Sequence, residues 1–105
     1  MKPITQKMLL RNVWEGLPQA VFIHTPLCGT CAAARRMLEV AEHLLPEDVL
    51  VEMNINDIPE LVQKYQISSV PALMLFDGEQ ERPTMVYRMN STQHLLGEIR
   101  KVVLG

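Results

Sequence analysis

The chain is organised around one short stretch, Thr25-Pro26-Leu27-Cys28-Gly29-Thr30-Cys31, which holds both cysteines of the 105-residue sequence. It follows an apolar run and precedes a long pattern of helical periodicity. A cysteine that opens a helix lies beside unpaired backbone N–H groups and a partial positive charge, which stabilise a thiolate. Cys31 falls on the same helix face as Cys28, one turn inward. The two sulfurs can therefore close a short disulfide, with Cys28 as the outward nucleophile and Cys31 placed to displace whatever it captures.

Length and composition indicate one globular domain over residues 1–105. Apolar residues make up 48% of the chain, charged residues 21%, and the formal net charge is −2. This balance gives no electrostatic basis for binding nucleic acid or an anionic membrane. The segment 1–7 lacks the apolar stretch of a signal peptide, and no apolar run is long enough to cross a bilayer, so we expect a cytoplasmic protein. In a reducing compartment, two cysteines at this spacing are more often catalytic, redox-sensing or metal-binding than structural.

Hydrophobic periodicity and turn signals predict an α/β chain in the order helix, strand, helix, strand, helix, strand, strand, helix. The predicted elements cover residues 5–15, 20–23, 28–45, 49–53, 57–65, 72–76, 84–89 and 91–103. Two successive strand–helix–strand units predict parallel pairing with right-handed crossovers, and the turn at Asp77-Gly78 predicts an antiparallel hairpin at the edge.

Three further expectations concern single side chains. Trp14, the only tryptophan, has the spacing of a core residue on the first helix. Asp57, with Glu60 three positions later, has the pattern of an N-cap and its capping partner. Arg35 is expected on the solvated face of the helix that follows the cysteines, where Glu39 stands four residues on.

Four segments, in this order and spacing, resemble thioredoxin, and the similarity covers nearly the whole chain from Ala20 on. A Cys-X-X-Cys alone is a weak signal, but a Val-Pro about forty residues later makes the match specific. The segments are Cys28–Cys31 after a strand, Asn54–Pro59 in the middle, Tyr65–Leu73 before an apolar strand, and Phe76–Gly78 at the turn.

The resemblance implies a thioredoxin-like three-layer fold, with a central mixed sheet of about four strands flanked by helices. It also implies a thiol-disulfide oxidoreductase without a cofactor, whose redox-active disulfide joins Cys28, the attacking thiolate, to Cys31, the resolving thiol. In the cytoplasm such a protein is expected to reduce disulfide-containing protein substrates. Its electrons would come from a thioredoxin reductase or a low-molecular-weight thiol, and we expect it to act as a monomer.

The resemblance further implies that the Val70-Pro71 bond is cis and lies beside the cysteines. The backbone of Val70 would pair with the substrate chain, and proline has no N–H to compete for the sulfur. Gly29 and Thr30, between the cysteines, complete the expected substrate-binding set.

Several residues depart from the usual thioredoxin pattern. Thr30 replaces a proline and brings a hydroxyl that could bond to the Cys28 sulfur, which would make this protein a weaker reductant than about −270 mV. Phe22 stands where many thioredoxins have a buried acid. Glu52 could take over from that acid or lie at a solvated strand end, and His24 could tune the Cys28 thiol or simply pack at the end of its strand.

Two other classes of function stay open. Cys-X-X-Cys is also half of a zinc site, with His24 as a conceivable third ligand, but a closed site needs four ligands and no second cysteine pair exists. His43 and His94 are expected on helices with no reason to converge there, so we expect no metal, although a cluster shared by two chains is not excluded by spacing. The second alternative is a redox-inactive binding domain. The presence of both cysteines argues against this alternative.

Overall fold

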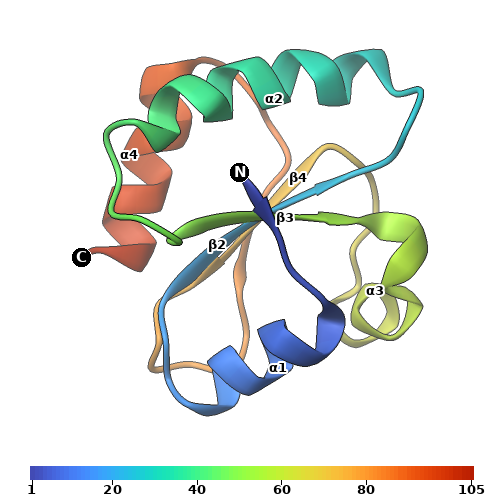
Figure 1. The fold of residues 1–105 in the computed structure, drawn as a ribbon, viewed down its shortest axis with the longest axis vertical. Helices are drawn as coiled ribbons and strands as arrows, with labels where there is room; N and C mark the ends of the chain where they lie inside the picture. Colours follow the sequence, from blue (N-terminus) through green and yellow to red (C-terminus); the bar gives the residue numbers. More distant parts are fainter.

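The computed structural model describes residues 1–105 and forms three layers, with a five-stranded sheet between two layers of helices (Figure 1). The strands are β1 (Lys2–Pro3), β2 (Gln19–His24), β3 (Leu50–Asn54), β4 (Ala72–Phe76) and β5 (Thr84–Val86). The helices are α1 (Gln6–Trp14), α2 (Gly29–Glu42), α3 (Pro59–Tyr65) and α4 (Thr92–Val103), with a 3-10 turn, η1, at Ile55–Asp57. The predicted three-layer α/β architecture is confirmed.

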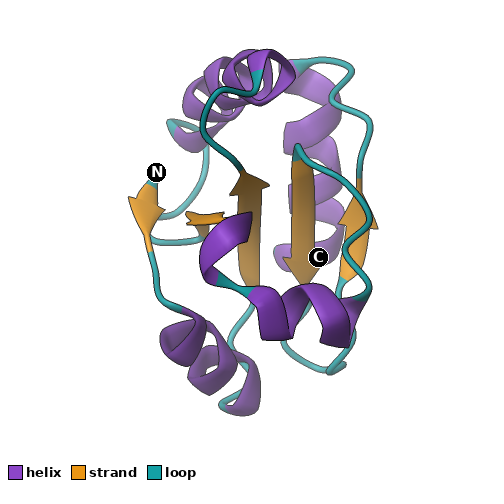
Figure 2. Ribbon diagram, turned by 90° about the vertical axis from the view of Figure 1, so that its right-hand side faces the viewer, coloured by secondary structure: helices purple, strands orange, loops and turns teal.

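The strand order is β1-β3-β2-β4-β5. Strands β1, β3 and β2 pair in parallel, whereas β4 is antiparallel to both β2 and β5, as the opposed arrows in Figure 2 show. The expected second parallel crossover is therefore wrong, because the chain leaving α3 enters the sheet beside β2 from the opposite end. The fifth strand, β1, was also not predicted, since Lys2-Pro3 carries no strand periodicity and pairs only at the sheet edge.

The two faces of the sheet carry separate apolar cores. Helices α2 and α4 cover one face and α1 and α3 the other (Figure 1). Because β2 and β4 are buried on both faces, their side chains alternate between the two cores, and this explains their continuous apolar sequence. Phe22 and Cys31 lie in the core beneath α2, and Leu9 and Ile23 lie in the other.

The start of α3 differs from the prediction. Asp57 belongs to the 3-10 turn, and Ile58 precedes the helix without a side-chain capping bond. Asn54 instead caps the turn through the N–H of Asn56, at 3.0 Å. Pro59, at the first position of α3, needs no N–H partner, so the helix can begin without the predicted cap.

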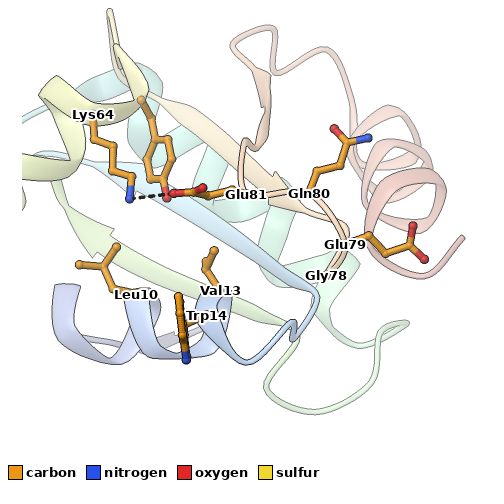
Figure 3. Close-up of a pocket in the computed structure, with 9 residues that line it drawn as sticks. Leu10, Val13, Trp14, Lys64, Gly78, Glu79, Gln80 and Glu81 are labelled. Atoms are coloured by element: carbon orange, nitrogen blue, oxygen red, sulfur yellow. Dashed lines mark ion pairs between the residues drawn. The ribbon is translucent and has the colours of Figure 1, made fainter.

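Trp14 is not a core residue, because 90% of its surface is exposed. The buried stripe of α1 is centred on Leu9 and Val13, and Trp14 lies about 100° further around the helix, at its last residue. Figure 3 shows Val13 pointing toward the Lys64–Glu81 ion pair and Trp14 extending away from it. Helical spacing alone could not separate the edge of the stripe from its centre.

No helix combines the length and the apolar character that a membrane crossing requires.

Candidate active site

Cys28 and Cys31 are joined by a disulfide at the start of α2. Cys28 is the N-cap, and its sulfur accepts a hydrogen bond from the Cys31 N–H at 3.1 Å. Cys28 is half-buried, whereas Cys31 is only 4% exposed. The outer sulfur is therefore the one that a substrate can reach, and the inner sulfur is protected, as the sequence predicts.

Thr30 places its hydroxyl 3.4 Å from the Cys28 sulfur, and both Thr30 and Gly29 are exposed. The contact has the geometry in which a hydroxyl donates to a thiolate. Leu27, directly before the motif, is fully exposed and has φ +61°, a left-handed conformation that leucine rarely adopts. The loop therefore presents an apolar side chain to solvent beside the reactive sulfur.

An apolar groove lies on one side of the motif. The Val70–Pro71 bond is cis, as the resemblance implies, and Pro71 and Thr30 line a cavity of about 350 Å³. Tyr87 also lines this cavity, and its hydroxyl accepts a hydrogen bond from the Ser68 N–H at 3.2 Å, which joins the loop before Pro71 to the segment that follows β5. The remaining lining residues are Ala33, Ala34, Met37 and Met89.

A charged cluster lies on the other side, beneath the first turns of α2. The Glu52 side chain is only 15% exposed, and both its oxygens accept hydrogen bonds from the Arg35 guanidinium, at 2.8 and 2.9 Å. The solvated-end interpretation of Glu52 and the solvated-face interpretation of Arg35 are therefore both wrong. Arg35 also lies over the ring of Phe22, at 5.5 Å from its centre. Phe22 itself is fully buried, in the place where many thioredoxins are expected to carry an acid.

His24 belongs to the same cluster. Its Nε2 atom lies 3.0 Å from Glu52 Oε1, its ring centre lies 5.3 Å from that of Phe22, and its side chain is 18% exposed. His24 also lines a cavity of about 280 Å³ together with Cys28, Cys31 and Arg35. The packing and tuning interpretations of His24 are thus compatible, since the side chain is packed and faces the site.

The electrostatics of the cluster favour charged forms. The Arg35 hydrogen bonds hold the pKa of Glu52 below its usual value against the effect of burial, and His24 lowers it further when the imidazole is protonated. The same hydrogen bonds raise the pKa of Arg35. Arg35 is the site residue that the sequence analysis missed. The signal that could have found it is its position four residues after Cys31, which places it on the same helix face.

No group of three or more His, Cys, Asp and Glu side chains in the structure is arranged to hold a metal ion. His43 caps the end of α2 and His94 lies in α4, where Glu98 is its ion-pair partner at 3.9 Å. Neither histidine lines the cavities beside the cysteines.

Comparisons with known proteins agree with this geometry. The Thioredoxin family profile matches residues 15–101. The thioredoxin of Rickettsia bellii is 31% identical over 85 residues, covering 79% of this chain and 81% of that protein. The thioredoxin-like protein YusE of Bacillus subtilis is 41% identical over 58 residues, and this match spans only 55% of either protein. The solved structure of chloroplastic thioredoxin z has a TM-score of 0.80 at 15% identity, covering 100% of this chain and 96% of that one, and so shows the same fold.

The matched region contains the disulfide, the cis-proline loop and all the strands of the sheet except β1. A half-buried Cys28 sulfur at a helix N-terminus and a buried Cys31 sulfur behind it supply what thiol-disulfide exchange needs. The chain therefore belongs to the thioredoxin family and is a thiol-disulfide oxidoreductase that uses the Cys28–Cys31 pair.

Proposed function

We propose that this protein reduces disulfide bonds of other proteins in the cytoplasm. The observation that carries the proposal is the asymmetry of the pair, with Cys28 half-buried at the N-cap of α2 and Cys31 only 4% exposed behind it. The Cys28 thiolate attacks a substrate disulfide and forms a mixed disulfide. The Cys31 thiol then loses its proton and attacks Cys28, which releases the reduced substrate.

The surroundings of Cys28 suit a protein substrate. Thr30 and Pro71 line the apolar groove on one side, and the exposed Leu27 adds apolar surface on the other. We propose that Gly29, Thr30, Val70 and Pro71 contact the substrate chain, with the Val70 backbone pairing with it. An extended segment would thereby bring its disulfide to Cys28.

The direction of exchange depends on potential and on partners, and the proposal rests here on the thioredoxin relatives. A thioredoxin reductase or a low-molecular-weight thiol would return electrons to the pair, and the protein would act as a monomer.

An insulin reduction assay tests this function. The oxidised protein is supplied with NADPH and a thioredoxin reductase, or with dithiothreitol alone, and precipitation of the reduced insulin chains is followed. We expect activity in at least one arm and none with Cys28→Ser. Cys31→Ser is the matched control, because it retains the attacking thiol and should accumulate a mixed disulfide with insulin. Native protein that is inactive in both arms would refute disulfide reduction.

A further inference from the structure

The resolving step poses a proton problem at Cys31. Its thiol must lose a proton before it can attack, yet it is only 4% exposed and lies in the core under α2. The side chain of Phe22, from the same core, can accept no proton. Because so little of Cys31 meets bulk solvent, a proton acceptor within the protein would speed resolution.

His24 is the basic group that the fold brings to this place. It follows Phe22 by two residues on β2, so both side chains face α2, and their ring centres are 5.3 Å apart. His24 and both cysteines line the same cavity of about 280 Å³, which has room for a water molecule between them. A proton can therefore pass from Cys31 to the imidazole through one water in this cavity.

Glu52 holds the imidazole from the side of the sheet. Glu52 Oε1 lies 3.0 Å from His24 Nε2. A neutral imidazole that carries its proton on Nε2, toward this carboxylate, has on Nδ1 the lone pair that can accept a proton. Two charged groups lie near His24. Glu52, from β3, is in direct contact with its ring. Arg35, from α2, is bound to the same carboxylate and lines the same cavity as His24. Arg35 keeps the Glu52 carboxylate ionised and fixed beside the imidazole.

Glu52 itself is a poor candidate for the acceptor. Both its oxygens are held by the Arg35 guanidinium at 2.8 and 2.9 Å, and Glu52 is not among the residues that line the cavity with the cysteines. A carboxylate paired in this way accepts a proton weakly. Glu52 therefore does not take over the proton-accepting role of the acid that is absent at position 22.

We propose that His24 is the proton acceptor for Cys31, with Glu52 and Arg35 as positioning residues. In the resolving step the Cys31 proton passes to His24, the Cys31 sulfur forms a bond to Cys28, and the bond between Cys28 and the substrate sulfur breaks. The substrate leaves as a thiolate and takes the proton from the imidazolium. The cysteine pair is oxidised by two electrons and the substrate disulfide is reduced by the same two. The inference concerns the exchange step and is independent of the direction proposed above.

The test uses the reduced protein and the aromatic disulfide DTNB in a stopped-flow experiment. A first nitrothiobenzoate is released when Cys28 captures the reagent, and a second when Cys31 resolves the mixed disulfide. Because this leaving group needs no proton, the second phase reports the ionisation of Cys31 alone. The reaction also proceeds whichever direction the protein works in, so a negative insulin assay would not affect it.

With His24→Gln we expect the second phase to slow at least about a hundredfold at pH 7, the low end of what general base catalysis contributes. In the native protein this rate should rise much less steeply with pH than in the variant, because a base within the protein removes the Cys31 proton. In the variant this rate should rise about tenfold per pH unit above about pH 7, because the Cys31 thiolate then forms only by loss of the proton to solvent. Imidazole added to His24→Ala should restore part of the rate, which a purely structural role of His24 would not allow.

His94→Gln is the matched control, because His94 also pairs with a glutamate, Glu98, but lies on α4 away from the cysteines. Its two phases should match the native ones. The inference is overturned if His24→Gln resolves within about twofold of the native rate with the same pH profile. It is equally overturned if the native second phase itself climbs tenfold per unit between about pH 7 and 8, a measurement that needs no variant to fold.

Discussion

Arg35 and Glu52 form a doubly hydrogen-bonded ion pair between α2 and β3, with Nη1–Oε2 at 2.9 Å and Nη2–Oε1 at 2.8 Å. The pair lies one helical turn beyond Cys31 and packs over the ring of Phe22. It therefore joins the helix that carries the cysteines to the sheet beneath it, and it fixes the side chain against which His24 rests.

Replacing Glu52 by Gln should destabilise the fold in a pH-dependent way. The pKa of Glu52 is lowered by Arg35, so its stabilising effect is complete above the usual glutamate range and disappears as pH falls through the lowered value. We expect a loss of about 1–3 kcal/mol in the free energy of unfolding at pH 7. Urea titrations followed by circular dichroism should show the difference shrinking below about pH 4. Glu98→Gln, which removes a contact at 3.9 Å, is the control and should change little.

Replacing Thr30 by Val should make the protein more reducing. Valine keeps the shape of threonine but removes the hydroxyl that lies 3.4 Å from the Cys28 sulfur, and so it withdraws a bond that stabilises the thiolate. A loss of about 1 kcal/mol corresponds to a potential lower by roughly 20 mV. Equilibration with dithiothreitol buffers would measure the shift. Thr30→Ser retains a hydroxyl and should leave the potential near the native value. An unchanged potential in the valine variant would show that the hydroxyl does not stabilise the thiolate.

Replacing Leu27 by Asn should stabilise the fold slightly. Leu27 is exposed and has φ +61°, where asparagine is tolerated better than leucine. The free energy of unfolding should rise by up to about 1 kcal/mol. The same variant should reduce insulin more slowly if the leucine contributes apolar contact to the substrate. A loss of stability on this substitution would contradict the strain assigned to the position.

Removing Trp14 should cost almost nothing. With 90% of its surface exposed, Trp14→Ser should change stability by less than about 0.5 kcal/mol. Leu9→Ala, on the buried face of the same helix, should cost about 2–5 kcal/mol. The native protein should already fluoresce like indole in water, and its emission should shift little on unfolding. A blue-shifted native emission would place the indole in an apolar environment and overturn this description.

The features that the sequence predicted are those with local causes. Cys28 lies at the start of α2, where the helical periodicity of the residues that follow placed it. Continuous apolar runs marked β2 and β4, since strands buried on both faces need them. The cis Val70–Pro71 bond was reached through the resemblance to thioredoxin and not from local chemistry, which does not distinguish it from other prolines.

The errors share a different origin, because each concerns where a surface of one element meets another. Trp14 has the spacing of a core residue, yet no element covers that edge of α1. Arg35 has the spacing of a solvated residue, yet β3 brings a carboxylate beneath it. Local sequence also could not determine the direction of β4, since the same apolar strand can pair parallel or antiparallel to its neighbour.

The sequence alone therefore determined the chemistry of this protein. The spacing of Cys28 and Cys31 at a helix start, and the absence of an acid at Phe22, follow from the order of residues. Only the tertiary structure decided what replaces that acid. The register that places Phe22 opposite Glu52, and the passage of α2 above them, bring together groups from residues 24, 35 and 52. Strand pairing and helix packing are long-range interactions, and the pattern along one segment does not encode which charge from another segment will lie beside it.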